Sequence, residues 1–177
     1  NYFKNKGRIN EQARIGMFLG HAYNASQQRD KAMNIYLVAL DLADRSQDYN
    51  LAGYINTYLA DQYKFEEKYN QAKEKYQEAA TYFEKANNLR SRVIAMTNTG
   101  FMSFFLKEND NIVLNYYTLS DSLALELKDS LVLCMVNNRI GLYYRMQEKY
   151  DLAEKYLIKS LEYSESDNIP NYITLSN

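Results

Sequence analysis

Apolar and small residues recur along this chain three or four residues apart, in paired stretches separated by short polar segments. That spacing places them on one face of an α-helix, whereas a strand would need alternation at every second residue. The predicted helices span residues 10–27, 30–46, 49–67, 70–87, 89–108, 111–128, 130–147 and 151–165. The pattern therefore predicts an all-α chain of consecutive helix pairs.

The paired stretches repeat with a period of about 40 residues. Small residues that would let two helices approach closely recur at intervals of 40, 40 and 41 residues, at Gly20, Ala60, Gly100 and Gly141. Twelve residues after each comes a second set, at Ala32, Ala72, Ile112 and Ala153. Four residues later comes a third set, at Tyr36, Tyr76, Tyr116 and Leu157. Such a repeat predicts helix pairs that bury their apolar faces only by stacking on one another.

Short polar residues repeat in the same register and predict the helix starts. Before the first helix of a pair stand Asp48, Asn88 and Asp129. Before the second helix stand Asp30, Asn70, Asp110 and Asp151. Their side chains can accept hydrogen bonds from the free N–H groups of a helix that begins there.

The repeated motif resembles the tetratricopeptide repeat (TPR). It is clearest in the first unit, at Leu19, Gly20, Tyr23, Ala32, Tyr36, Ala39 and Leu40. The third unit is the weakest match, with Thr99, Ser103 and Ile112 where the motif has Leu, Tyr and Ala. The period exceeds the usual length of about 34 residues. In this respect the chain is similar to long-repeat TPR proteins of bacterial signalling and regulation.

The resemblance implies a right-handed superhelical solenoid of about four full repeats with partial helices at the ends. The expected repeats are residues 8–47, 48–87, 88–128 and 129–167. Residues 168–177 would begin a fifth repeat, and residues 1–7 would be the tail of an earlier helix. We therefore expect a piece of a longer array or of a larger protein.

Composition narrows the functional classes. The 21 basic and 22 acidic residues give a net charge of −1, which provides no basic excess for a nucleic acid. One cysteine, Cys134, and one histidine, His21, are too few for a disulfide framework or a zinc site. No apolar run approaches the roughly 20 residues that cross a bilayer. We expect no cofactor, no metal and no catalytic activity; the composition fits a periplasmic or a cytoplasmic segment equally.

The resemblance also implies where a partner would bind, because the first helices of TPR units line a concave groove. The expected groove residues are Met17, His21, Asn24, Tyr54, Thr57, Asp61, Lys64, Phe65, Thr97, Phe101, Phe104, Phe105, Asn138, Leu142 and Arg145. The same positions extend to Arg14, Ala25, Ile94, Met135 and Met146. The phenylalanines could hold an apolar anchor of a partner or could be buried against the next unit, and the sequence leaves both open.

We therefore expect a non-catalytic module that binds a protein or peptide, as the sensor or scaffold segment of a bacterial signalling or transcription-regulatory protein. The main alternative is a structural array that forms homo-oligomers through its end repeats. An enzyme with its active site in the groove is a remote third hypothesis, since the sequence contains no phosphate-binding loop and no partner for Cys134.

Overall fold

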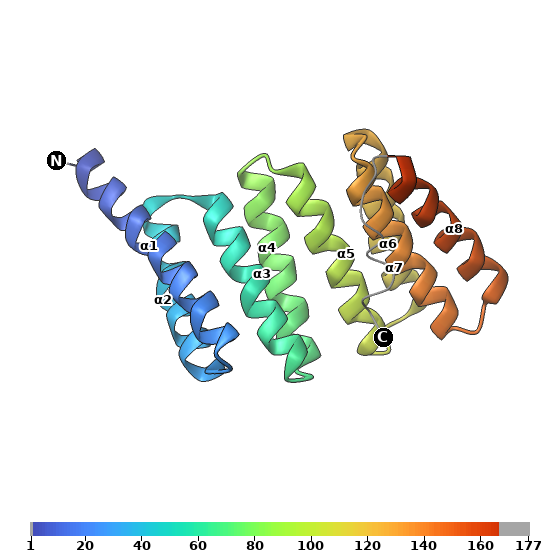
Figure 1. Cartoon of the computed structure of the whole chain (residues 1–177), viewed down its shortest axis with the longest axis horizontal. Coiled ribbons are helices and arrows are strands. Elements are labelled where there is room, and N and C mark those ends of the chain that lie inside the picture. The colour runs from blue at the N-terminus through green and yellow to red at the C-terminus, as the bar shows by residue number, and fades with distance from the viewer. Residues whose placement is uncertain (1, 167–177) are drawn as a thin grey trace. The chain divides into compact units, whose positions relative to one another are not determined.

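The computed structural model describes the backbone of residues 2–166 and the side chains of residues 6–165 (Figure 1). Within that range the chain is entirely helical, which confirms the all-α prediction. The helices are α1 (Tyr2–Ala25), α2 (Arg29–Ser46), α3 (Tyr49–Phe65), α4 (Tyr69–Lys85), α5 (Leu89–Phe105), α6 (Asp110–Leu127), α7 (Ser130–Met146) and α8 (Tyr150–Ser166). The expected fifth repeat at 168–177 lies outside the described residues. The expected tail at 1–7 is not a separate helix, because α1 continues through Gly7.

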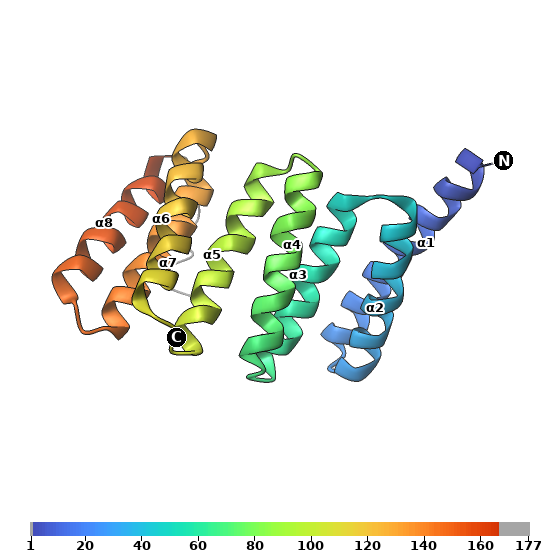
Figure 2. The same ribbon diagram turned by 180° about the vertical axis from the view of Figure 1, so that it is seen from behind.

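The helices pack as consecutive pairs, as the 40-residue period predicts. α1 lies on α2, α3 on α4, α5 on α6, and α7 on α8 (Figures 1 and 2). The chain divides into two compact units, Asn1–Asn88 and Leu89–Asn177, each with two pairs. In unit 1, α2 also packs against α3, and in unit 2, α6 also packs against α7. Each unit therefore contains the contact by which one repeat joins the next.

Glycines set the distance between paired helices. A Cβ atom added to Gly141 would lie 2.7 Å from Cγ of Leu157, and one added to Gly100 would lie 2.9 Å from Cβ of Tyr116. Real Cβ atoms do not approach so closely, so only glycine allows these helix pairs their observed separation. The interpretation of the recurring small residues is confirmed at both positions.

Buried tyrosines fill the space between adjacent repeats. Tyr36 of α2 lies beside Gly20 and stacks on Tyr58 of α3, with ring centroids 5.8 Å apart. In unit 2, Tyr117 of α6 lies beside Gly100 and meets Tyr143 of α7 at 5.6 Å. Because a tyrosine buries up to about 200 Å² of surface, each ring joins three helices into one core.

The turns explain how the chain forms eight described helices with six glycines. Each turn has one non-glycine residue with a positive φ of 53–61°. These residues are Gln27, Gln47, Glu67, Asn87, Lys107, Lys128 and Glu148. A left-handed residue after a helix lets its N–H bond back to the last turn. The chain thus uses polar residues at positions that glycine commonly occupies.

The capping prediction is confirmed at Asp48 and Asp129 and is wrong at the starts of α2, α4 and α6. Asp48 accepts from the Leu51 N–H at 3.0 Å, and Asp129 accepts from the Val132 N–H at 3.1 Å. In contrast, α2 begins at Arg29, before Asp30, and α4 begins at Tyr69, before Asn70; neither helix has a side-chain cap.

The acidic residues near the starts of second helices have a different role from capping. Asp30, Asp110 and Asp151 lie within the first helical turn. A negative charge there is favourable because the helix N-terminus carries a partial positive charge. At Asp110 the cap is instead Asn109, whose side chain accepts from the Asn111 N–H at 2.8 Å.

The third repeat corrects one part of the sequence alignment. Ile112, placed with the buried alanines, is 45% exposed, whereas Val113 is 1% exposed. Likewise Tyr117, and not Tyr116, is the fully buried tyrosine of α6. The segment between α5 and α6 is 106–109, one residue longer than 26–28, 66–68 and 147–149 in the other pairs. That extra residue moves the buried face of α6 one position along the sequence.

Candidate functional site

A small cleft lies between α1 and α3 of unit 1. It has a volume of about 260 Å³. Its walls are Arg14, Met17, Phe18, Asp48, Asn50, Leu51 and Tyr54. Two expected groove residues, Met17 and Tyr54, therefore face the same cleft, as does Arg14. Phe18 was missed; its sequence signal is the large apolar side chain directly after Met17 on the same helix.

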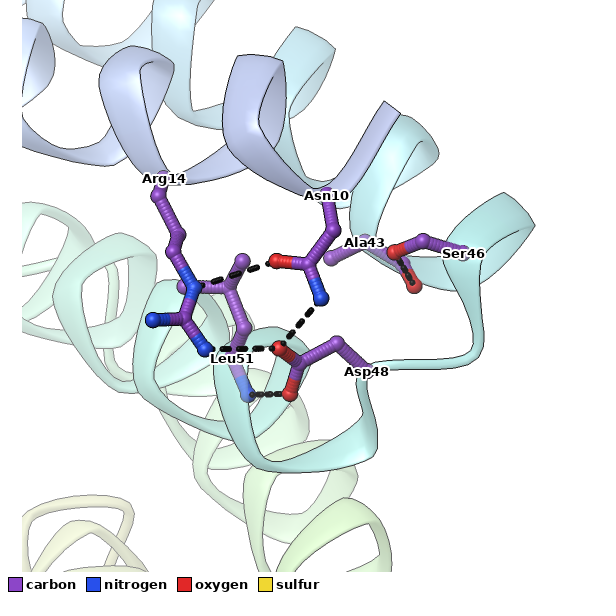
Figure 3. A network of polar contacts seen from close by, with 6 residues as sticks. All are labelled: Asn10, Arg14, Ala43, Ser46, Asp48 and Leu51. Atoms are coloured by element: carbon purple, nitrogen blue, oxygen red, sulfur yellow. Dashed lines mark hydrogen bonds and ion pairs between the residues drawn. The ribbon is translucent and has the colours of Figure 1, made fainter. Parts of the chain in front are cut away.

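The polar wall of this cleft is a hydrogen-bonded network around Asp48 (Figure 3). Asp48 accepts from Asn10 Nδ2 at 3.0 Å and from Arg14 Nη2 at 3.4 Å, in addition to the Leu51 N–H. Burial alone would raise the pKa of this carboxyl, but the three donors and the Arg14 charge outweigh it and lower the pKa. Asp48 is therefore ionised at neutral pH and fixes the start of α3 to α1.

His21 lies in an aromatic cluster where α1, α2 and α3 meet. Its ring centroid is 4.2 Å from that of Tyr58, 5.9 Å from Tyr36 and 6.3 Å from Phe18. Among the described residues, its buried Nε2 atom has no hydrogen-bond partner. Burial lowers the pKa of His21, because the charged imidazolium would lose its hydration. His21 is thus a neutral packing residue at pH 7.

Other expected site residues on α3 are engaged within unit 1. Asp61 accepts from Lys64 Nζ at 2.7 Å and from the Tyr76 hydroxyl at 2.5 Å. The Thr57 hydroxyl donates to the Gly53 carbonyl at 3.0 Å. These polar groups already form hydrogen bonds within unit 1, so a partner that bound them would have to replace those bonds.

The C-terminal ends of α1 and α3 carry the two remaining predicted residues of unit 1. Asn24 is exposed and lies outside the cleft. Phe65 is also exposed, and the Arg29 guanidinium covers its ring at 3.6 Å from the centroid. This cation–π contact joins the end of α3 to the start of α2.

A larger cleft lies in unit 2, at the C-terminal ends of α5 and α7. Its volume is about 480 Å³. It is lined by Phe104, Phe105, Lys107, Glu108, Asp110, Met146 and Gln147. Apolar side chains come from both first helices. Of the polar ones, Lys107 and Glu108 lie in the longer turn at 106–109, Asp110 begins α6 and Gln147 directly follows α7. Sequence reasoning missed all four polar residues, which lie outside the predicted groove positions.

The phenylalanines of unit 2 divide between core and cleft. Phe104 meets Tyr143 edge-on at 5.5 Å and packs against the buried cluster of unit 2. Phe105 lies 5.7 Å from Phe104 and 4.9 Å from Phe101, whose ring carries the Arg139 guanidinium at 4.4 Å. Phe104 therefore packs against the core and also lines the cleft, while binding of a partner's apolar anchor stays a prediction.

The remaining predicted residues of unit 2 do not line this cleft. Thr97 is buried, and its hydroxyl donates to the Val93 carbonyl at 2.8 Å. Asn138 and Leu142 are half-buried on α7, and Arg145 is exposed. Some residues of the predicted groove therefore line one of two separate clefts, and others serve packing.

Within residues 2–166, no three His, Cys, Asp or Glu side chains gather as they would around a metal ion. Over the same part of the chain, none of the helices combines the length and apolar character needed to cross a membrane.

Comparison with known proteins identifies solved structures with a similar fold. No protein-family model and no curated protein matches the chain by sequence. Solved structures do match: the apo form of RapI has a TM-score of 0.77 at 16% identity, over 89% of this chain and 57% of that one. Aspartyl phosphate phosphatase F from Bacillus subtilis has a TM-score of 0.79 at 18% identity, over 94% and 43%.

BtubC from P. vanneervenii is a third structural match, with a TM-score of 0.73 at 18% identity, over 88% of this chain and 64% of that one. This chain therefore spans less than two thirds of each of these three proteins. The matches confirm a TPR-like helical repeat fold.

Proposed function

We propose that this chain is a non-catalytic repeat module that binds a protein or peptide through the first-helix cleft of unit 2, as the sensor or scaffold segment of a larger bacterial signalling or transcription-regulatory protein. The fold likeness to RapI and to aspartyl phosphate phosphatase F is consistent with a protein-binding repeat. More specific support for the proposal comes from the cleft in unit 2.

The observation that carries the proposal is the cleft of about 480 Å³ lined by Phe104, Phe105 and Met146. Aromatic side chains provide apolar contact area at little cost in side-chain entropy, methionine adapts its shape to a ligand, and both are enriched in binding surfaces. A buried leucine- or phenylalanine-sized anchor gains about 1.5–3 kcal/mol from leaving water. The cleft therefore suits one large apolar side chain of a peptide, with the 106–109 turn contacting its backbone.

The test is selection of a random peptide display library on the intact chain, followed by calorimetric titration of the enriched peptides. Met146→Lys should weaken binding by about tenfold or more, because a charge replaces an apolar wall. Met135→Lys is the matched control, since Met135 is an exposed methionine of the same helix outside the cleft. Equal binding by both variants, or enrichment of no peptide, would contradict the proposal.

A structural array that forms homo-oligomers is the second candidate, and the exposed apolar side chains of α8 favour it. Tyr150, Ile158 and Leu161 are all exposed on this helix. Sedimentation velocity over a hundredfold concentration range would decide, with Ile158→Lys as the test variant. Association that this substitution abolishes would favour the oligomer.

A further inference from the structure

Helix α1 carries an exposed apolar stripe that no described element covers. Ile15 is 65% exposed, Phe18 64% and Leu19 40%. Their spacing places all three on one face of the helix. Exposed apolar side chains gathered on one helix face are a candidate binding surface.

The repeat shows how the same face is used elsewhere in the chain. Forty residues later, α3 carries Ile55, Tyr58 and Leu59 at the corresponding positions. Ile55 and Leu59 are completely buried, and Tyr58 is half-buried, because α2 packs on this face. The stripe on α1 is therefore the surface by which a first helix receives the second helix of another repeat.

Unit 2 repeats the arrangement independently. Val136 and Ile140 of α7 lie 81 residues after Ile55 and Leu59. They are 1% and 4% exposed, and α6 packs against α7. Both units thus show the same interface, and in both the covering element is an amphipathic helix.

The covering helix has a recognisable chemistry. α2 brings Tyr36 onto the ring of Tyr58, and Leu40, one turn later, packs against the same buried cluster. On α1 the position of Tyr58 is taken by Phe18, which would accept an aromatic ring in the same way. A matching partner helix therefore carries an aromatic residue followed four residues later by an aliphatic one.

One position of the stripe adds a charge requirement. Leu51 of α3 is 6% exposed, and its counterpart forty residues earlier is Glu11. A helix that covered Glu11 would have to neutralise its carboxylate, since an unpaired buried charge is strongly unfavourable. Since α2 runs antiparallel to α3, the compensating lysine or arginine belongs near the C-terminal end of the partner helix, where cations are also favoured.

We propose that the α1 stripe docks an amphipathic partner helix of this kind: aromatic residue, aliphatic residue four positions later, and a basic residue within the following turn. The partner helix lies on Ile15, Phe18 and Leu19 as α2 lies on α3. This interface is distinct from the unit 2 cleft, so either proposal can fail without the other.

The test uses the intact chain and two labelled peptides, one with the sequence of residues 29–46 and one with the same sequence carrying Asp44→Lys. Fluorescence anisotropy should show tighter binding of the basic peptide, because it pairs with Glu11. Ile15→Lys should weaken binding about tenfold or more. Leu37→Lys, at an exposed leucine on the outer face of α2, should leave it unchanged.

A tethered version removes the cost of folding a free peptide. A copy of residues 29–48 fused directly before Ile9 should raise the urea midpoint of the chain, and Ile15→Lys should cancel that rise. Absence of both effects overturns the proposal. Concentration-dependent dimerisation of the unfused chain that Ile15→Lys abolishes would also overturn it, because the occupant would then be a second copy.

Discussion

The same corner of the repeat pair carries a cation–π contact in unit 1 and a cleft in unit 2. In unit 1, Phe65 at the end of α3 is covered by Arg29 from the start of α2. The corresponding residues of unit 2, 81 positions later, are Met146 and Asp110, which both line the open cleft. The two units have the same helix pairs, so the difference lies in a few side chains and one turn.

Two further differences from unit 1 lie at the cleft of unit 2. Phe104 and Phe105 replace the smaller Asn24 and Ala25 at the end of the first helix. The turn that follows has four residues, 106–109, where unit 1 has three, 26–28. The difference teaches that stacking fixes the frame of a repeat protein, while the turn length and the helix ends are free to form a site.

The largest expected effect tests the shifted register of α6. Val113→Asp should destabilise unit 2 by about 4 kcal/mol or more, because it buries a carboxylate without a partner. Ile112→Asp should change stability by less than about 0.5 kcal/mol, as expected for a surface position. Urea denaturation followed by circular dichroism measures both, and the shifted register of α6 would be wrong if the two effects were reversed.

Hydrogen exchange of the Val113→Asp variant tests whether the two units unfold separately. In Val113→Asp, amides of residues 89–166 should lose protection while those of unit 1 keep theirs, because the two units have separate cores. Equal loss in both units would show that they unfold as one cooperative body.

The fold could be predicted from the sequence because two periodicities agree. The apolar period identified the helix pairs, and Asp48 and Asp129 marked the starts of first helices. The shift in α6 could not be seen, since Ile112 and Val113 are both apolar and either satisfies the pattern. Only the burial of one and the exposure of the other separates them.

The candidate site was harder to predict, because position in a repeat does not determine what a side chain contacts. His21, Thr57 and Thr97 occupy groove positions, yet each is engaged in packing or in a bond within its own helix. The unit 2 cleft depends on the conformation of residues 106–109. A repeat motif does not show by itself in which turn an extra residue has been inserted.

A smaller effect tests what holds the longer turn of unit 2 in place. The Tyr143 hydroxyl donates to Asp110 Oδ1 at 2.8 Å, which ties α7 to the first turn of α6. Tyr143→Phe should cost about 1.5–3 kcal/mol, the usual net value of a hydrogen bond to a charged group. It should also speed hydrogen exchange at residues 110–113.

Tyr76→Phe is the matched variant of unit 1, since it removes the hydrogen bond from Tyr76 to Asp61. It should have a similar energetic cost but leave exchange at 110–113 unchanged. If Tyr143→Phe also left that exchange unchanged, the bond would not be what positions the turn.

The smallest expected effect is a pH dependence of stability that arises in unit 1. His21 is the chain's single histidine, and it lies in unit 1, where burial lowers its pKa below 6.5. As the pH falls, His21 of the unfolded chain therefore binds a proton before His21 of the folded chain does. The contribution of His21 to the free energy of unfolding is fully present above about pH 6.5, and it is lost as the pH drops toward the folded-state pKa. Urea titrations at about pH 7 and pH 5.5 should show a loss in the wild type that His21→Phe reduces. Asp48, whose pKa is lowered, contributes only at more acidic pH. An identical pH dependence in both proteins would mean that His21 is not held in its neutral form by the ring cluster.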